Sequence, residues 1–195
     1  MSAKADVIAR ACAAIETASP NDAAALLNAH YPFQPTLNAG RRYTAAQCMD
    51  VFTRDGFIDR YSGQKLVFPG TLRLLSWLVP EAFPFQSNWK SDSCHFAYYE
   101  LFPTIDHRVP VSRGGADHFD NWVTTSMLRN AAKTNFTVEE LAWTVHAPGR
   151  LEDWDGLTGW FLRQWEDRPD IWSDPYLSRW RKAALSWTAA LFRQE

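Results

Sequence analysis

The residues whose types and spacing could perform chemistry lie in one stretch, 104–135. The adjacent pair Asp106 and His107 opens it, and Asn121 and Asn130 follow. Hydrolysis of a phosphodiester needs a base that deprotonates water and a positive charge that stabilises the phosphate and the leaving oxygen. A histidine, whose ordinary pKa is ~6.5, can be the base, and a hard divalent cation on oxygen ligands can supply the charge. The stretch therefore predicts a metal-dependent phosphodiesterase site.

The elements that must position these side chains are two strands and a helix. We expect Asp106 and His107 near the end of a strand, where a twist or bulge would let both side chains approach one site. Asn121 is expected to pin the following loop or to orient His107. Asn130 lies about one turn into the helix and can present its carbonyl oxygen as a second metal ligand. The predicted segments are a strand continuing through 109–111, a glycine turn at 114–115, a second strand at 123–125 and a helix at 126–133.

The motif in this stretch resembles that of a known enzyme family. The pattern Asp106-His107-x-x-Pro110, Gly114-Gly115, Asn121 and Asn130-x-x-Lys133 is similar to that of the HNH endonucleases, whose fold is a ββα-metal finger. The variant it resembles has Asn as the third motif residue. The resemblance covers about residues 54–135, and RDGFIDRYSG (54–63) is similar to an upstream element of the family.

The resemblance implies a role for each motif residue. Asp106 and Asn130 would bind the metal, His107 would be the general base, and Asn121 would order the loop. The implied cofactor is one divalent cation, Mg²⁺ first and Mn²⁺ as an alternative, and the implied partner is DNA. The residues expected to contact phosphate are Arg108, Arg113, Arg129 and Lys133.

One departure from the family concerns a structural zinc. Many HNH proteins carry two cysteine pairs around the finger, whereas here Asp59 and Ser62 stand at the first pair and Ser126 and Arg129 at the second. Without thiolates we expect no structural zinc. We expect an Asp59–Arg129 ion pair, together with the serine hydroxyls, to bridge the same gap.

The flanking sequence is mostly helical, and we expect one domain over 1–195 of the α+β class, predominantly helical. A ββα-metal core at 54–135 would carry an N-terminal helical extension at 1–53 and Trp-rich C-terminal helices at 136–195 packed on it. Within the core we expect a short β-hairpin around 57–68, a helix at 71–78 and a strand at 98–102. The remaining predicted helices are 3–18, 20–30, 44–52, one opening at Thr137, 155–165 and one opening at Asp174.

Composition limits the class of protein. The formal net charge of −2 over 195 residues excludes a protein that coats nucleic acid through bulk charge, although it leaves local contact to DNA open. Cys12, Cys48 and Cys94 stand singly, which argues against a disulfide framework and favours a reduced, cytoplasmic location. No signal pattern and no apolar run of ~20 residues indicates a membrane partner.

Two functional interpretations remain open at this point. The first is a DNA endonuclease in which His107 activates the attacking water, and the complete set of Asp106, His107 and Asn130 favours it. The alternative is a catalytically weak DNA-binding or protein-complex subunit of a restriction, defence or mobile-element system. The sequence indicates neither the DNA sequence that would be cut nor nicking as against double cutting, and it leaves protein partners and a homodimer open.

Overall fold

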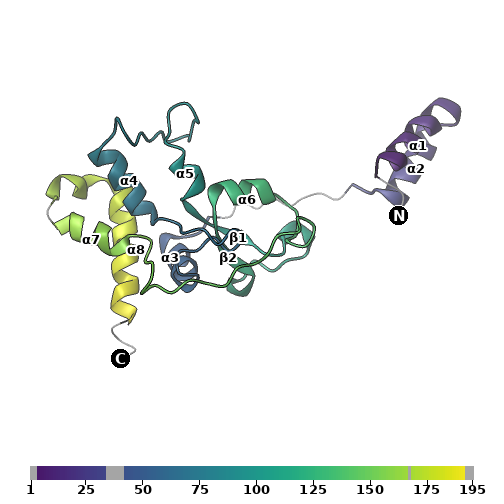
Figure 1. The fold of residues 1–195 in the computed structure, drawn as a ribbon. Helices are drawn as coiled ribbons and strands as arrows, with labels where there is room; N and C mark the ends of the chain where they lie inside the picture. The colour runs from purple at the N-terminus through teal and green to yellow at the C-terminus, as the bar shows by residue number, and fades with distance from the viewer. Residues whose placement is uncertain (1–3, 34–41, 167, 192–195) are drawn as a thin grey trace. The chain divides into compact units, whose positions relative to one another are not determined.

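The computed structural model describes residues 4–33, 42–166 and 168–191, and its fold is α+β and predominantly helical (Figure 1). The chain divides into two compact units, Met1–Gly40 and Arg41–Glu195. No helix within the described ranges is long and apolar enough to cross a membrane.

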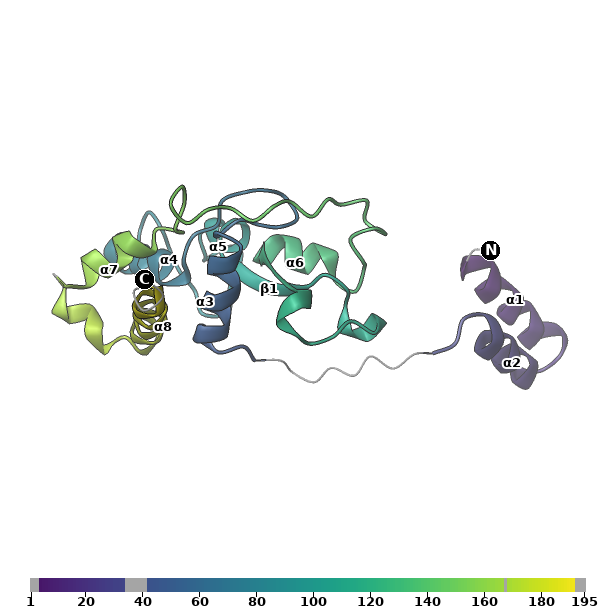
Figure 2. The ribbon, with the colours of Figure 1, turned by 90° about the horizontal axis from the view of Figure 1, so that it is seen from below.

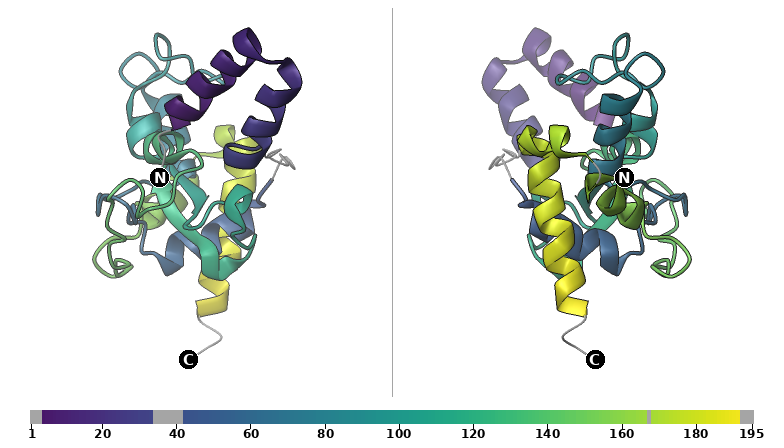
Figure 3. Two further views of the ribbon diagram at one scale, coloured as in Figure 1. Left: turned by 90° about the vertical axis from the view of Figure 1, so that its right-hand side faces the viewer. Right: turned by 90° about the vertical axis from the view of Figure 1, so that its left-hand side faces the viewer.

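The first unit is a pair of helices, α1 (Lys4–Thr17) and α2 (Pro20–His30), as the sequence predicts (Figure 3). Ser19 caps α2, because its hydroxyl accepts a hydrogen bond from the backbone N–H of Asp22 at 3.2 Å. Proline follows at the first helical position, where its missing N–H costs nothing. The apolar side chains that this pair buries are Val7, Ala11 and Ala23.

The second unit is organised around a two-stranded antiparallel sheet. Strand β1 (Pro103–His107) pairs with β2 (Trp122–Ser126) in a regular register that runs from Pro103 opposite Ser126 to His107 opposite Trp122. Helix α6 (Met127–Lys133) begins directly after β2, where the Ser126 hydroxyl accepts the N–H of Arg129 at 3.2 Å. Helix α3 (Ala45–Arg54) also packs on the sheet (Figure 2). Strand, strand and helix therefore follow one another as the sequence predicts.

Four further elements build the main core of the second unit. They are α4 (Pro69–Leu78), α7 (Thr158–Glu166), the 3₁₀ helix η3 (Pro169–Ser173) and α8 (Pro175–Leu191). Helix α8 packs against α3 and α4, and aromatic rings fill the space between them. Phe68 contacts Phe161 and Trp180 edge-on, with ring centroids 5.2 and 5.5 Å apart. Much of the aromatic content therefore lies in the core beside the sheet.

A buried carboxylate ties α3 to the sheet. Asp55 is fully buried and accepts hydrogen bonds from Arg54 at 2.9 Å, from Arg60 at 2.7 Å and from the backbone N–H of Thr124 at 2.7 Å. A buried charge is tolerated only when it is paired and hydrogen-bonded, and Asp55 meets both conditions. The same carboxylate thereby fixes the end of α3 and the middle of β2.

The strand expected at 98–102 is instead the short helix α5 (Ala97–Glu100), and the strand begins only at Pro103. Tertiary packing explains the difference, because Tyr98 is buried against α4 and against Phe83, Phe85 and Trp89 of the preceding loop. Its hydroxyl donates to the carbonyl of Leu72 at 2.9 Å and lies 2.7 Å from the Ser76 hydroxyl. The helical turn brings the Tyr98 hydroxyl to these partners, and the strand predicted from the sequence is therefore not formed.

The strand expected to continue through 109–111 ends at His107 and gives way to the 3₁₀ helix η1 (Val111–Arg113). The cause is Asn121, whose Oδ1 accepts the N–H of Val109 at 3.0 Å and whose Nδ2 donates to the Val109 carbonyl at 2.9 Å. The side-chain amide thus takes both backbone groups that a strand partner would use.

The helix expected to open at Thr137 does not form. Residues 138–142 make a hydrogen-bonded turn instead. The predicted capping hydrogen bonds are present, with Thr137 N–H donating to the Glu140 carboxylate at 2.9 Å, but the chain turns away at Ala142, whose φ is +53°. Trp143 then packs on Tyr61 with ring centroids 5.6 Å apart, and Val138 is buried in the same cluster. Packing of these two side chains is incompatible with continuing the helix.

Replacement of Asp55 tests the role of the buried carboxylate. Asp55→Asn keeps the shape but removes the charge that two arginines share, so we expect the free energy of unfolding to fall by about 3 kcal/mol. Urea denaturation followed by Trp fluorescence measures it. The matched control is Asp153→Asn, at a side chain 70 % exposed, which should change stability by less than about 0.5 kcal/mol. Equal effects of the two substitutions would contradict the assigned role.

Candidate metal and catalytic site

The carboxylate of Asp106 lies between two proton donors. Its Oδ2 accepts a hydrogen bond from the Tyr61 hydroxyl at 2.6 Å and forms an ion pair with the Lys133 ammonium at 2.8 Å. Burial, reinforced by the neighbouring carboxylate, raises the pKa of Tyr61 above its usual value, so the phenol keeps its proton. The two donors therefore hold the Asp106 carboxylate in a fixed orientation.

Asn130 reaches the same strand from α6. Its Nδ2 donates to the Thr104 hydroxyl at 3.0 Å and to the carbonyl of Ile105 at 3.2 Å. A carbonyl can only accept, so these two bonds fix which end of the amide is nitrogen. The carbonyl oxygen of Asn130 is thus the end of the amide that does not bond to β1. The nitrogen end bonds at Ile105, the residue before Asp106.

These two residues fit a hydrated divalent cation. Oδ1 of Asp106 and the amide oxygen of Asn130 take no hydrogen bond from the described part of the chain. Mg²⁺ prefers oxygen ligands and is commonly held by one or two protein oxygens, with water and substrate phosphate completing the shell. Among the described residues, no group of three or more His, Cys, Asp or Glu side chains is arranged to hold a metal ion.

His107 is buried and held by two neighbours. Its Nε2 lies 2.8 Å from Oδ1 of Asp117, and the Trp122 Nε1–H lies 3.0 Å from the same oxygen. The Trp122 Nε1–H also points at Nε2 itself, at 3.1 Å. Because a carboxylate only accepts, a proton on Nε2 lets both the imidazole and the indole donate to Asp117, and we assign this tautomer to the neutral ring. Nδ1 then carries the lone pair and is the nitrogen that can take a proton from water.

The expected bulge between Asp106 and His107 is absent, because the register of the two strands is regular through both residues. Neighbouring side chains of a regular strand point to opposite sides. Asp106 accordingly contacts Lys133 of α6, whereas His107 contacts its cross-strand neighbour Trp122. Both residues nevertheless stand at the last two positions of β1, so they share one end of the sheet.

Asn121 pins the loop that leads away from β1. Besides its two bonds to Val109, it donates to the carbonyl of Ala116 at 2.8 Å. The loop closes tightly enough that a Cβ atom on Gly115 would lie 1.9 Å from the Val109 carbonyl oxygen, and Gly114 has a φ of +85°. The amide and the two glycines therefore order the loop, which is the role that the sequence suggested for Asn121.

The four cations expected to contact phosphate lie in different environments. Lys133 is fully buried, donates to the His107 carbonyl at 2.7 Å and pairs with Asp106, so it is unable to reach DNA from the surface. Arg113 pairs with Glu140 at 2.7 Å, and Arg129 lies over the Trp143 ring at 5.2 Å. Arg108 is exposed and forms no ion pair with any residue that the structure describes.

The expected Asp59–Arg129 ion pair is not formed. Asp59 is fully buried, with Oδ1 accepting the Thr125 hydroxyl at 3.0 Å and Oδ2 accepting the N–H of Ser126 at 3.0 Å. Backbone and hydroxyl donors thus take the place of the guanidinium. Ser126 caps α6, whereas the Ser62 hydroxyl accepts only a local bond from Gln64 at 3.4 Å and does not bridge the two segments.

Sequence reasoning missed three members of the site: Tyr61, Asp117 and Trp122. Tyr61 lies 45 positions from Asp106, and no local pattern connects them. Asp117 stands in an Asp-containing loop ten positions after His107, so a search for an acid near the histidine could have found it.

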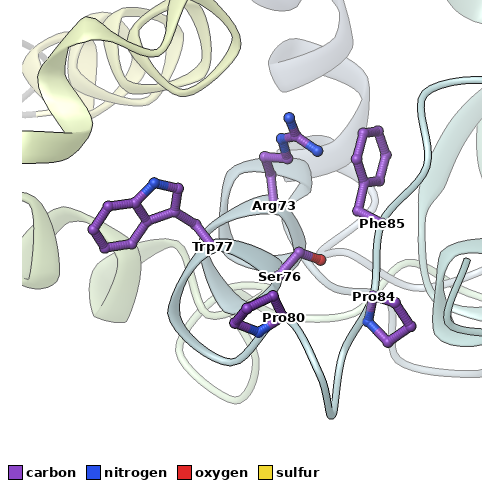
Figure 4. Close-up of a pocket in the computed structure, with 6 residues that line it drawn as sticks. All are labelled: Arg73, Ser76, Trp77, Pro80, Pro84 and Phe85. Atoms are coloured by element: carbon purple, nitrogen blue, oxygen red, sulfur yellow. The ribbon is translucent and has the colours of Figure 1, made fainter.

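A separate hollow lies away from this site. Figure 4 shows it between α4 and the loop that follows, with the Arg73 guanidinium 3.9 Å from the centroid of the Phe85 ring. Its volume is about 250 Å³, and its lining comprises Arg73, Ser76, Trp77, Pro80, Pro84 and Phe85. None of the residues predicted to act on a phosphodiester lines it.

Comparison with protein-family models, with characterised proteins and with solved structures finds no match for this chain.

Substitution of Lys133 separates a structural role from contact with phosphate. Lys133→Met would leave the Asp106 carboxylate largely buried without its cation, so we expect the free energy of unfolding to fall by about 3 kcal/mol. Thermal or urea denaturation without DNA measures this. Lys182→Met, at an exposed position of α8, should leave stability nearly unchanged. Equal stability of the two variants would contradict a structural role of Lys133 and would favour the predicted contact with phosphate.

Proposed function

We propose that this chain is a metal-dependent endonuclease of the HNH type that hydrolyses phosphodiester bonds in DNA. The observation that carries the proposal is the attachment of Asn130 to β1 through its amide nitrogen. That attachment leaves the amide oxygen without a hydrogen bond from the described residues, next to the strand whose last two residues are Asp106 and His107. Two hard oxygen ligands and a neutral imidazole are the groups that metal-assisted hydrolysis of a phosphodiester requires.

Each residue of the site has a distinct role in this proposal. A bound divalent cation, Mg²⁺ or alternatively Mn²⁺, supplies positive charge to the scissile phosphate and the leaving oxygen. Asp106 and Asn130 would hold that cation. His107 takes the proton of the attacking water on Nδ1, while the Asp117 carboxylate accepts from its Nε2–H and from the Trp122 Nε1–H.

Lys133 sets the strength of cation binding. Its ammonium already compensates the charge of Asp106 at 2.8 Å, so a second cation gains less from this carboxylate than from an unpaired one. With two protein oxygens available, a bound cation would have room for phosphate oxygens of the substrate. We therefore propose that cation and DNA bind together rather than in sequence.

The alternative function is that of a DNA-binding or protein-complex subunit with weak catalysis. The observation that favours it is the internal use of cations, because Lys133, Arg113 and Arg129 all contact groups of the same chain. With a net charge of −2, affinity for DNA is then low at physiological salt, and a partner protein could supply it.

Plasmid nicking in the presence of Mg²⁺ tests the proposed activity. We expect His107→Ala to slow nicking by about 10²- to 10⁴-fold, because general-base catalysis contributes that much. Asn130→Ala should slow nicking and raise the Mg²⁺ concentration that half-maximal activity requires. Matched controls are His118→Ala and Asn135→Ala, which change exposed residues of the same types.

The controls should nick at the wild-type rate. Nicking at equal rates by wild type, His107→Ala and Asn130→Ala would reject the assignment of the site. Absence of nicking in all proteins, with binding to DNA retained, would favour the non-catalytic alternative.

A further inference from the structure

A small cavity lies between the start of β1 and the helices α3 and α8. Its volume is about 210 Å³, which is the space of about seven water molecules at ~30 Å³ each and is comparable to that of one nucleobase. Four of its lining side chains are aromatic, namely Tyr43, Phe52, Phe102 and Trp180. Aromatic side chains are the groups on which proteins stack unpaired nucleobases.

The cavity borders residues that position the proposed catalytic groups. The hydroxyl of Thr104, which lines it, accepts a hydrogen bond from Nδ2 of Asn130 at 3.0 Å. The hydroxyl of Tyr43, which also lines it, lies 3.4 Å from Oδ1 of Asp117, the carboxylate that His107 contacts. A group bound in the cavity therefore lies next to the supports of both the proposed metal ligand and the proposed general base.

The Trp180 indole brings an unpartnered donor to the lining. Trp180 is 5 % exposed, and its Nε1–H has no acceptor among the described residues. Burial raises the pKa of the Tyr176 phenol, one helical turn earlier, and the indole N–H opposes this shift, but the two groups lie outside hydrogen-bond geometry. A buried donor without an acceptor is costly, and an acceptor on a bound ligand would relieve that cost.

A cation stands beside the cavity. Arg179 precedes Trp180 on α8, is exposed and forms no ion pair with any residue that the structure describes. Its guanidinium lies over the Tyr176 ring, 5.1 Å from the centroid. Burial raises the pKa of the Cys48 thiol in the lining to about 12, and Arg179 opposes this rise, so the field of the guanidinium reaches the cavity. An anionic group at this place would meet an uncompensated positive charge.

We propose that the cavity holds one base of the DNA substrate, thymine by preference, while Arg179 contacts the phosphate of the same nucleotide. The inference rests on the proposed endonuclease function and adds to it the part of the substrate that the chain binds beside the cleaved bond. A base enters such a cavity only by leaving the stack of the duplex, which costs least at a mismatch or in a single strand. The cavity would therefore favour cleavage next to unpaired positions.

The polar groups of the lining favour thymine. The proton of the Thr104 hydroxyl goes to the Thr125 carbonyl at 3.1 Å, so the Trp180 N–H is the donor left for a ligand. No carboxylate or amide side chain of the described residues belongs to the lining. The exocyclic amino group of adenine, cytosine or guanine would find no such acceptor, whereas thymine presents carbonyl oxygens and a methyl group.

Nuclear magnetic resonance titration of the full chain with deoxynucleoside monophosphates tests the site without relying on cleavage. The Nε1–H signal of Trp180, identified by sequential assignment, should shift when dTMP is added, because its proton gains an acceptor. We expect dCMP and dAMP to bind about 10-fold more weakly, since each would bury an unpaired amino group. Inorganic phosphate alone should leave the signal in place.

Replacement of Arg179 tests the contact with phosphate at an exposed position, where the fold tolerates substitution. Arg179→Ala should weaken the binding of dTMP about 10-fold and leave the binding of thymidine, which has no phosphate, unchanged. The matched control is Arg163→Ala, an exposed arginine of α7 outside the lining, which should bind dTMP as the wild type does.

Two results would overturn the proposal. A Trp180 Nε1–H signal that stays in place up to 20 mM dTMP would show that no base enters the cavity, even if the chain nicks plasmid DNA. Equal affinity of wild type and Arg179→Ala for dTMP would remove Arg179 from the site. A chain that binds dTMP as described and does not nick DNA would instead keep the base site and reject the endonuclease function.

Discussion

Two buried carboxylates, Asp55 and Asp59, support the arrangement of the second unit. Each is fully buried, and each accepts a backbone N–H of β2, from Thr124 and Ser126 respectively. The cost of burying two charges is offset because each receives several hydrogen bonds, and three of those to Asp55 come from two arginines, Arg54 and Arg60. The segment after α3 is thereby fastened to β2 at two points.

The position of the candidate site depends on these attachments. Strand β2 carries the start of α6 at its end, and α6 carries Asn130 and Lys133 to β1. In many proteins of the family that the sequence resembles, a zinc ion on two cysteine pairs joins these regions. Here a single carboxylate, Asp59, spans from the first of those positions to Ser126 at the second. A hydrogen-bonded acid thus joins the segment after α3 to the residue that caps α6.

Elements whose conformation depends on neighbouring residues in the chain were predictable from the sequence, and elements that depend on distant residues were not. Helices α1, α2, α3 and α8 were predictable because capping residues and apolar periodicity are local signals. The segments at Tyr98 and Thr137 were not, because the buried contacts of Tyr98 and Trp143 with distant residues decide their conformations. Local preference is a weak guide wherever such packing opposes it.

The site was predictable to a similar extent. The motif predicted that Asn121 orders its loop and that Asn130 lies on the helix after the second strand. Both positions depend on short loops and on the adjacent strand. It did not reveal that Lys133 is buried against Asp106, because the type of a residue does not fix which of its neighbours will desolvate it. The partners of His107 were likewise hidden, since Asp117 reaches the ring only through the shape of an irregular loop.

The central claim is that Asp106 and Asn130 together hold a divalent cation. Crystals soaked in Mn²⁺, measured for anomalous scattering, test it most directly. We expect an anomalous peak within about 2.5 Å of both the Asp106 carboxylate and the Asn130 amide oxygen, as for a divalent cation on oxygen ligands. A protein that cleaves DNA with Mn²⁺ but shows its peak elsewhere, or shows none between these two oxygens, would contradict it.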